Sequence, residues 1–293
     1  MKNKLSLFAV PYVGWMSIFV VAPIIIMVVY AFSTAAGDFT LENFARMGTY
    51  TAVFTRSFKL AIIATLIALL IGYPVSYMLS KEGPQVQRIA MVLIMLPMWM
   101  NFLLRTYSWM SILENNGLLN QLFQQIGLID LYNQIAMLFA SDPAAYVPID
   151  HFQMIGTQGA VVLGMVYNYL PFMILPIYSV LVKLDHSLIE AARDLGASSV
   201  QVFRKVILPL SLPGVLSGIT MVFVPSVSTF AISRLLGGGT QMMLGDLIEQ
   251  QFLGGAYNPQ LGAAIALVMM AIVVVCMLVM NRFGDGEEQA VML

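Results

Sequence analysis

Charged residues are scarce in this sequence of 293 residues. They make up 10% of the chain, while apolar residues make up 59%; a soluble domain carries about 25% charged residues. The formal net charge is -1, which provides no basic patch and argues against electrostatic binding of nucleic acid. The composition therefore indicates a protein that lies in a lipid bilayer.

Residues that carry chemistry are few as well. The one cysteine, Cys276, lies in an apolar run, so no disulfide forms within the chain and the thiol is expected to serve packing. The two histidines, His151 and His186, lie near loops. No G-x-S-x-G or H-E-x-x-H pattern occurs, and the triple glycine at residues 237–239 lacks the Lys-Ser or Lys-Thr of a phosphate loop. We therefore predict no catalytic residue and no metal site.

Six long apolar runs occupy most of the chain, and each is long enough for a bilayer span of about 20 residues. They cover residues 5–32, 60–80, 89–113, 160–182, 207–233 and 261–281. We predict an all-α integral membrane protein with six transmembrane helices and a single transmembrane domain over residues 1–293. The first run also fits a cleavable signal peptide, but it is about twice as long as the usual signal core, which favours a retained anchor.

The lysine and arginine residues of the loops predict the orientation of the chain. With the N-terminus in the cytoplasm, nine of them fall on the cytoplasmic side and five on the outer side. The cytoplasmic nine are Lys2, Lys4, Lys81, Arg88, Lys183, Arg193, Arg204, Lys205 and Arg282, and the outer five are Arg46, Arg56, Lys59, Arg105 and Arg234. This excess favours both termini in the cytoplasm.

Two of the predicted outer loops carry structure of their own. Residues 106–158 contain an expected interfacial helix near residues 116–126, then Gly127 and an irregular stretch. A loop of this length is usually functional or disordered. Between the fifth and sixth runs, residues 242–252 predict a short amphipathic helix.

The predicted cytoplasmic segment over residues 184–206 differs from the rest because it is both amphipathic and charged. Ser187 is followed three residues later by Glu190, and Ser198 by Gln201. This spacing is the capping box, in which the side chains satisfy free backbone N–H groups at a helix start. The segment therefore predicts two short, capped helices in succession.

Gly196 stands where the first of these helices would end in a left-handed cap. The helix predicted for residues 188–195 collects small and apolar side chains on one face. They are Leu188, Ala191, Ala192 and Leu195. Such a face invites close approach by another protein surface.

No carboxylate falls in the middle of a predicted span. Ion-coupled carriers normally hold acids inside the membrane, so the energy for any transport is expected to enter from outside this chain. The segment over residues 184–206 is the expected entry point. A stand-alone secondary carrier or channel is the alternative from another class, and it predicts transport by this chain alone in liposomes.

Within this segment, Glu190-Ala191-Ala192, Gly196, Val206 and Leu208-Pro209 resemble the EAA motif of ABC importer permeases, which has isoleucine where this chain has Val206. The resemblance implies the type I ABC importer permease fold.

Other stretches, at residues 169–179, 183–198 and 235–252, are similar to the B-type permease subunit of spermidine/putrescine importers. Iron, sulfate and molybdate permeases share much of this pattern, so the same machine with another solute is an alternative. Residues 141–157 match none of these families.

The resemblance implies partners and roles. The EAA helix would dock on a cytosolic ATPase dimer, which binds ATP and Mg, so that this chain holds no cofactor and is not an enzyme. A second homologous permease would complete the pathway, and an extracytoplasmic binding protein would deliver the substrate at the bacterial inner (plasma) membrane. The implied coupling residues are Glu190, Ala191, Ala192, Leu195 and Gly196.

Polar and aromatic residues inside the spans are the candidates for the translocation pathway. They are Trp99, Asn101, Tyr167, Asn168 and Tyr169. An amide within a span needs a polar partner or a water-filled cavity, and aromatic faces suit a cationic polyamine through cation–π contact.

Overall fold

The structure is a computed structural model that describes the backbone of residues 11–139 and 146–291, and the side chains of these ranges up to residue 280. All regular elements in the described ranges are helices, and one isolated β-bridge joins Ser33 to Phe39. The prediction of an all-α membrane protein is confirmed. Residues 5–10 of the first predicted span, and the cationic side chains of Lys2, Lys4 and Arg282, lie outside this description.

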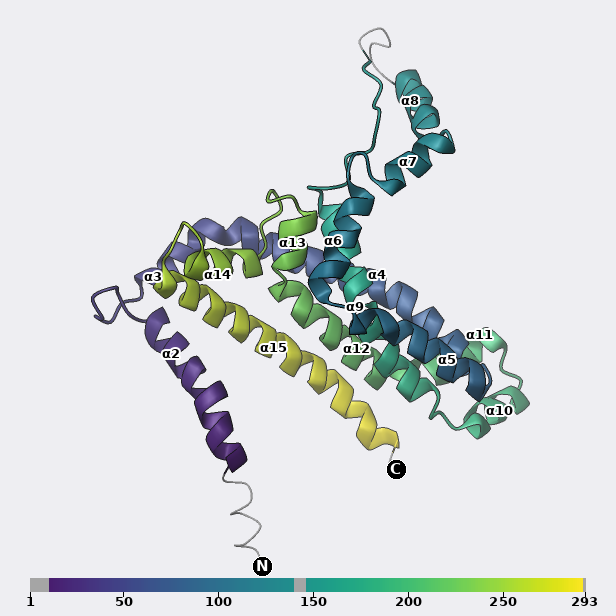
Figure 1. Ribbon diagram of the computed structural model, residues 1–293. Coiled ribbons are helices and arrows are strands. Elements are labelled where there is room, and N and C mark those ends of the chain that lie inside the picture. The colour runs from purple at the N-terminus through teal and green to yellow at the C-terminus, as the bar shows by residue number, and fades with distance from the viewer. Residues whose placement is uncertain (1–10, 140–145, 292–293) are drawn as a thin grey trace, which may run out of the picture.

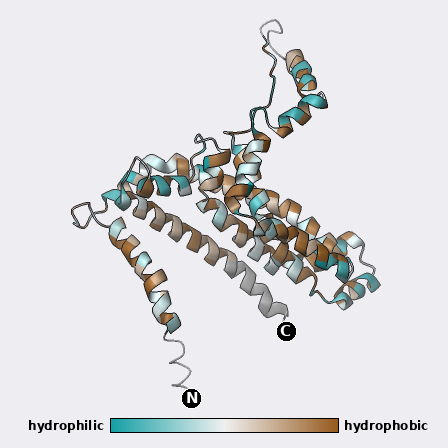
Figure 2. Cartoon of the chain, viewed as in Figure 1, coloured by the Kyte–Doolittle hydropathy of each residue, from teal (hydrophilic) through white to brown (hydrophobic). Residues whose placement is uncertain are grey.

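Five described helices are long and apolar enough to cross a membrane, and the number is six if a bent pair of helices is counted as one span. The five are Pro11–Ala31, Glu42–Ser80, Gln158–Leu181, Ser199–Ser228 and Pro259–Met280. Figure 1 shows the long helices gathered into a bundle, with the C-terminal end of α15, α10 and the α4–α5 turn toward one end of it. Figure 2 shows hydrophobic residues concentrated along these helices.

The labelled helices in chain order are α2 (Ala22–Ala31), α3 (Glu42–Arg46), α4 (Thr51–Ser80), α5 (Pro84–Met95), α6 (Phe102–Leu113), α7 (Leu118–Gln125), α8 (Leu128–Phe139), α9 (Gln158–Leu181), α10 (His186–Asp194), α11 (Ser199–Val202), α12 (Leu208–Ser228), α13 (Ala231–Leu236), α14 (Leu244–Leu253) and α15 (Pro259–Val291). Short 3-10 turns cover Met47–Tyr50 and Leu96–Trp99, and π turns cover Ser17–Val21 and Phe203–Ile207.

Helices α4, α9 and α12 form the core of the bundle. Small residues allow their backbones to approach: a Cβ added at Gly72 would stand 2.9 Å from the Met173 side chain, and one at Gly214 would stand 2.8 Å from the Pro176 carbonyl. Close contact at small residues is the usual means of helix association in membranes. The first span stands apart in Figure 1 and packs mainly against α15.

The third predicted span, residues 89–113, is not one straight helix. The chain bends by 90° between Pro84–Trp99 and Phe102–Gln125. Asn101 makes this bend, because its Oδ1 accepts hydrogen bonds from the backbone N–H groups of Leu103 at 2.8 Å and Leu104 at 3.4 Å and so begins a new helix.

The fifth predicted span, residues 207–233, also differs from the observed one. The helix begins earlier, at Ser199, and ends at Ser228, where Thr229 adopts an extended conformation. A short separate helix, α13, then follows. The N-terminus of α14 lies against this break, since a Cβ on Gly245 would stand 2.4 Å from the Ser228 carbonyl.

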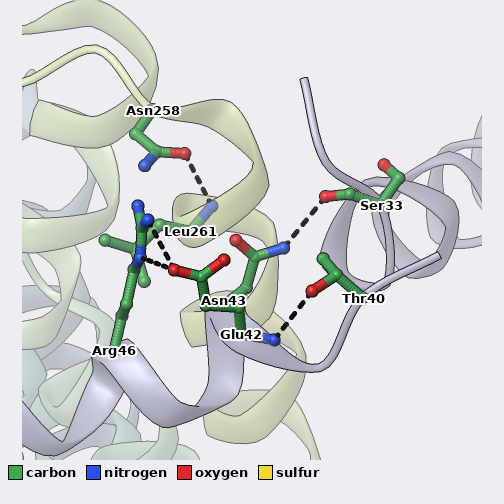
Figure 3. A network of polar contacts seen from close by, with 7 residues as sticks. All are labelled: Ser33, Thr40, Glu42, Asn43, Arg46, Asn258 and Leu261. Atoms are coloured by element: carbon green, nitrogen blue, oxygen red, sulfur yellow. Dashed lines mark hydrogen bonds and ion pairs between the residues drawn. The ribbon is translucent and has the colours of Figure 1, made fainter. Parts of the chain in front are cut away.

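A polar network holds the outer ends of the first and last spans, as Figure 3 shows. The Asn43 Nδ2 donates to the carbonyl oxygens of Ala31 at 3.1 Å and Ser33 at 3.0 Å. The Asn258 Oδ1 accepts from the Leu261 N–H at 3.1 Å and begins α15. The Asn43 bonds tie α3 to the end of the first span, and α3 also packs against α15.

The outer segment before α9 is more ordered than the sequence predicts. The interfacial helix predicted near residues 116–126 is α7, but α8 follows where an irregular stretch was expected, and Figure 1 shows this hairpin projecting from the bundle. Asn133 fastens it, since its Nδ2 donates to the Ile149 carbonyl at 2.9 Å and its Oδ1 accepts from the Ile149 N–H at 3.0 Å.

Candidate coupling site and transport pathway

The N-terminal cap of α10 is Asp185 and not Ser187. The Asp185 Oδ1 accepts the Ser187 backbone N–H at 2.9 Å, and this backbone hydrogen bond, followed by one from the Ser187 side chain, lowers the pKa of the Asp185 carboxyl. The predicted capping box of Ser187 with Glu190 is therefore wrong, and α10 begins two residues before the predicted Leu188.

The C-terminal end of α10 is the predicted left-handed glycine cap. Gly196 has φ +83°, its N–H donates to the Arg193 carbonyl at 2.8 Å, and the Ala197 N–H donates to the Ala192 carbonyl at 3.1 Å. These two bonds make a Schellman motif, which satisfies carbonyl groups that would otherwise be free at the helix end. The chain therefore reverses direction at Gly196 while the carbonyl groups of Ala192 and Arg193 stay hydrogen-bonded.

The second predicted capping box is confirmed. The Ser198 Oγ accepts the Gln201 N–H at 3.4 Å, and the Gln201 Oε1 accepts the Ser198 N–H at 2.8 Å. Helix α11 therefore starts immediately after the elbow at Gly196. It continues through the π turn into α12, so that the coupling segment and the fifth span form one continuous helical rod from Ser199 to Ser228.

The faces of α10 differ in one respect from the prediction. Leu188 and Leu195 are exposed, the latter by 89%. Glu190 and Ala191 are exposed too. Ala192, predicted to lie on the same outward face, is partly buried and packs with Ile189 against the cluster of Val202 and Ile207. The helix thus faces outward with Leu188, Ala191 and Leu195, while Ala192 anchors it to its own chain.

An aromatic joint connects this segment to the second span. The Phe203 ring lies edge-on to Tyr77 at 5.3 Å and to Tyr73 at 5.9 Å. The Tyr73 hydroxyl in turn lies 2.9 Å from the Ser211 Oγ on α12. Packed rings and a hydrogen bond therefore join the segment that contains Phe203 to α4 and α12.

The three polar and aromatic candidates on α9 lie where α9 meets α6 and α13. The Tyr167 ring lies 5.2 Å from Trp109 of α6. Asn168 is 2% exposed, and its Nδ2 donates to the Gly164 carbonyl at 2.8 Å, while its Oδ1 has no partner among the described residues. Tyr169 is partly buried next to Thr229, at the break in the fifth span.

The two candidates on the third span lie at its bend. Trp99 is 75% exposed, and the exposed Asn101 caps α6 as described above. Two of the five candidates therefore lie at the bend, and the other three lie on α9. Irregular backbone at membrane depth occurs where protein or a water-filled cavity covers it and not against lipid.

Two buried charges escaped the sequence prediction, namely Arg105 and Asp246. Arg105 was counted as a loop residue, although it follows the bend inside an apolar run. Asp246 ties α13 to α14, since its Oδ2 accepts from the Ser233 hydroxyl and, at 3.1 Å, from the Met243 N–H. Burial is the largest effect on the Asp246 carboxyl and raises its pKa. The capping position of Asp246, three residues after Met243, was the available signal for its role.

The sequence matches the family described as "binding-protein-dependent transport system inner membrane component" over residues 68–286. The spermidine/putrescine transport system permease protein PotB of Escherichia coli (strain K12) is 35% identical over 281 residues, covering 93% of this chain and 95% of that protein. PotB of Haemophilus influenzae is 35% identical over 285 residues, covering 93% of each.

Solved structures share the fold at low sequence identity. A bacterial ABC transporter for import of the acidic polysaccharide alginate superimposes with a TM-score of 0.76 at 16% identity, covering 97% of this chain and 96% of that one. The inward-facing MetNI methionine ABC transporter gives a TM-score of 0.54 at 19% identity, covering 84% of this chain and 98% of that one.

Proposed function

Because the chain belongs to the family of binding-protein-dependent transport system inner membrane components, we propose that it is the permease subunit of an ABC importer for polyamines such as spermidine and putrescine. The observation that supports polyamines as the substrate is the 35% identity to PotB over 93% of the chain. The chain is a multi-pass membrane protein with the type I importer permease fold.

The partners of this subunit follow from the same reasoning. A cytosolic ATPase dimer would bind ATP and Mg and hydrolyse the nucleotide, a second permease would complete the pathway, and an extracytoplasmic protein would deliver the polyamine. The exposed face of α10, with Glu190, Leu188, Ala191 and Leu195, supports docking of the ATPase. Gly196 makes the elbow behind this face, and Ala192 holds the helix to its own bundle.

The pathway is proposed to pass the bend of the third span and the facing part of α9. Trp99, Asn101, Tyr167, Asn168 and Tyr169 would line or support it. The amide of Asn168, whose buried Oδ1 has no partner among the described residues, supports this placement, because a polar group within a span needs a partner or water.

Uptake of labelled spermidine tests the substrate. Cells that lack this subunit should lose ATP-driven spermidine and putrescine uptake and regain it when the subunit is restored. Labelled sulfate, molybdate and iron measured in the same cells provide the comparison. Unchanged polyamine uptake with loss of one of these solutes would reject the polyamine assignment and keep the importer. Transport by the purified chain alone in liposomes would instead indicate a secondary carrier.

A further inference from the structure

Arg105 holds a positive charge inside the protein, and no counter-ion lies beside it among the described residues. Its side chain is 8% exposed, and its Nε and Nη1 are enclosed and make no hydrogen bond within the described residues. The ion pairs found in the described ranges involve other arginines, Arg46 and Arg234. A buried charge is normally paired. Because Arg105 has no such partner among the described residues, its electrostatic potential is not cancelled locally.

The position of Arg105 indicates what this potential acts on. It lies in the first turn of α6, directly after the bend at Asn101. Arg105 lies near Tyr169 of α9, and Tyr169 lies near Thr229; helix α6 packs against α9 and against α13, which follows Thr229. Thr229 marks the break in the fifth span. Arg105 therefore lies at the junction of two broken spans.

The energetics of the membrane restrict what this junction can face. Open backbone within the membrane is tolerated only where it is buried in protein or lines a water-filled passage, and a charged side chain at this depth faces the interior or such a passage. The bend at Asn101 and the break at Thr229 both leave such open backbone, and α6, which follows the bend, packs against α13, which follows the break. The uncompensated charge is thus set beside the region proposed to carry the substrate.

We propose that Arg105 is an electrostatic seal, a fixed cation that repels cations from the junction of the two broken spans while the passage is closed. The proposal rests on the proposed function, since it concerns an importer whose substrate is a cation. A weakly screened unit charge about 10 Å away, at an effective dielectric constant of about 20, lowers the local occupancy of each positive charge about tenfold. The effect multiplies with the number of charges on the polyamine.

The test uses the complete complex of both permeases and the ATPase in proteoliposomes, without ATP or binding protein. Efflux of labelled putrescine, labelled spermidine and neutral labelled sorbitol is measured. We expect Arg105→Gln to raise the efflux of putrescine about tenfold and that of spermidine more, and to leave the efflux of sorbitol unchanged. Arg105→Lys keeps the charge and should show the efflux of the wild type. Arg46→Gln is the matched control, because Arg46 is exposed and paired with Glu42 at 2.7 Å.

A second variant tests the charge within one preparation. Arg105→Cys, in a chain that also carries Cys276→Ser, is treated after assembly with aminoethyl methanethiosulfonate, which adds an ammonium group, or with methyl methanethiosulfonate, which adds none. Only the ammonium label should reduce the polyamine leak. Cation-tight Arg105→Gln, equal leak of sorbitol, or equal effects of the two labels would overturn the proposal.

Assembly is checked first by co-purification of the second permease and the ATPase. Failure of both neutral variants to assemble, with normal assembly of Arg105→Lys, would assign Arg105 a structural role and would also overturn the seal. The substrate is tested separately by ATP-driven uptake in the wild-type complex with its binding protein. A wild type that takes up no polyamine, together with a cation leak in Arg105→Gln, would reject the proposed function and leave the seal intact.

Discussion

At the scale of single residues, Leu195 is the most exposed apolar side chain on the outward face of α10. We expect Leu195→Ala to weaken binding of the ATPase about tenfold, since truncation of an anchoring contact costs more than about 1 kcal/mol. Stability of the isolated subunit should not change, because the side chain contributes little to its own core. Co-purification of the ATPase at several concentrations measures the effect. Leu253→Ala is the control, as Leu253 is 83% exposed on α14, and equal ATPase binding in both variants would count against docking through α10.

Gly196 allows a second test of the same element. Its φ of +83° disfavours a β-branched side chain, although a Cβ there would meet nothing within 4 Å, so the cost is backbone strain of about 1–2 kcal/mol. We expect Gly196→Val to insert in the membrane and to lose about tenfold of its ATP-driven uptake. The matched variant Gly83→Val also has open space and a negative φ of −69°, and it should transport normally. Normal uptake by correctly assembled Gly196→Val would show that the elbow geometry is dispensable.

Asp246 predicts a dependence of stability on pH. Burial raises the pKa of its carboxyl in the folded chain. The contribution of this carboxyl to stability is therefore full below its pKa in the unfolded chain, and it is lost as the pH rises through its pKa in the folded chain. Asp246→Asn keeps an acceptor for Ser233 and Met243 but carries no charge. We expect it to raise the melting temperature at pH 8 and to change it little at pH 4. An equal shift of the melting temperature at both pH values would contradict this assignment.

At the scale of elements, we propose that the joint of Phe203 with Tyr73 and Tyr77 carries motion from the coupling segment into the bundle. Each ring pair is worth about 0.5–1.5 kcal/mol beyond its buried area. We expect Phe203→Ala to bind the ATPase normally but to transport fewer polyamine molecules per ATP hydrolysed, by roughly tenfold. Phe39→Ala removes a ring that is 77% exposed and stacked on Phe32 at the outer side, and its transport ratio should match the wild type. A normal ratio in Phe203→Ala would place the transmission elsewhere.

The elements were predictable to different degrees, for physical reasons. The fourth span was predicted as residues 160–182 and is observed as Gln158–Leu181, because length and hydropathy alone define it. The bend in the third span depends on the amide of Asn101 capping a new helix, which a hydropathy run does not show, although an asparagine before an apolar run is a known cap signal. The cap of α10 was misplaced because Asp185 and Ser187 are both good cap residues.

At the scale of the whole molecule, hydropathy and charge predict the number and order of spans but not their packing. The position of Arg105 near Tyr169, and of Ala192 against its own bundle, depends on contacts between elements distant in sequence. Such contacts have no period in the sequence. The coupling residues remain a prediction, which a motif within one continuous stretch makes possible, whereas the two buried charges are defined by burial.

The sidedness of the molecule provides the last prediction. The turn between α4 and α5 and the helix α10 lie toward the same end of the bundle. The hairpin of α7 and α8 follows the C-terminal end of α6 and lies away from that end of the bundle (Figure 1). The excess of Lys and Arg on the first side predicts that it is cytoplasmic. Alkaline phosphatase inserted at Gly127, which is open and has φ +73°, should be active outside, and a fluorescent protein inserted at Gly83, also open, should fluoresce inside. Exchange of the two reporters should silence both. Activity of both reporters in the exchanged pair would show the opposite orientation. It would then place α10 outside the cytoplasm, where the ATPase could not dock.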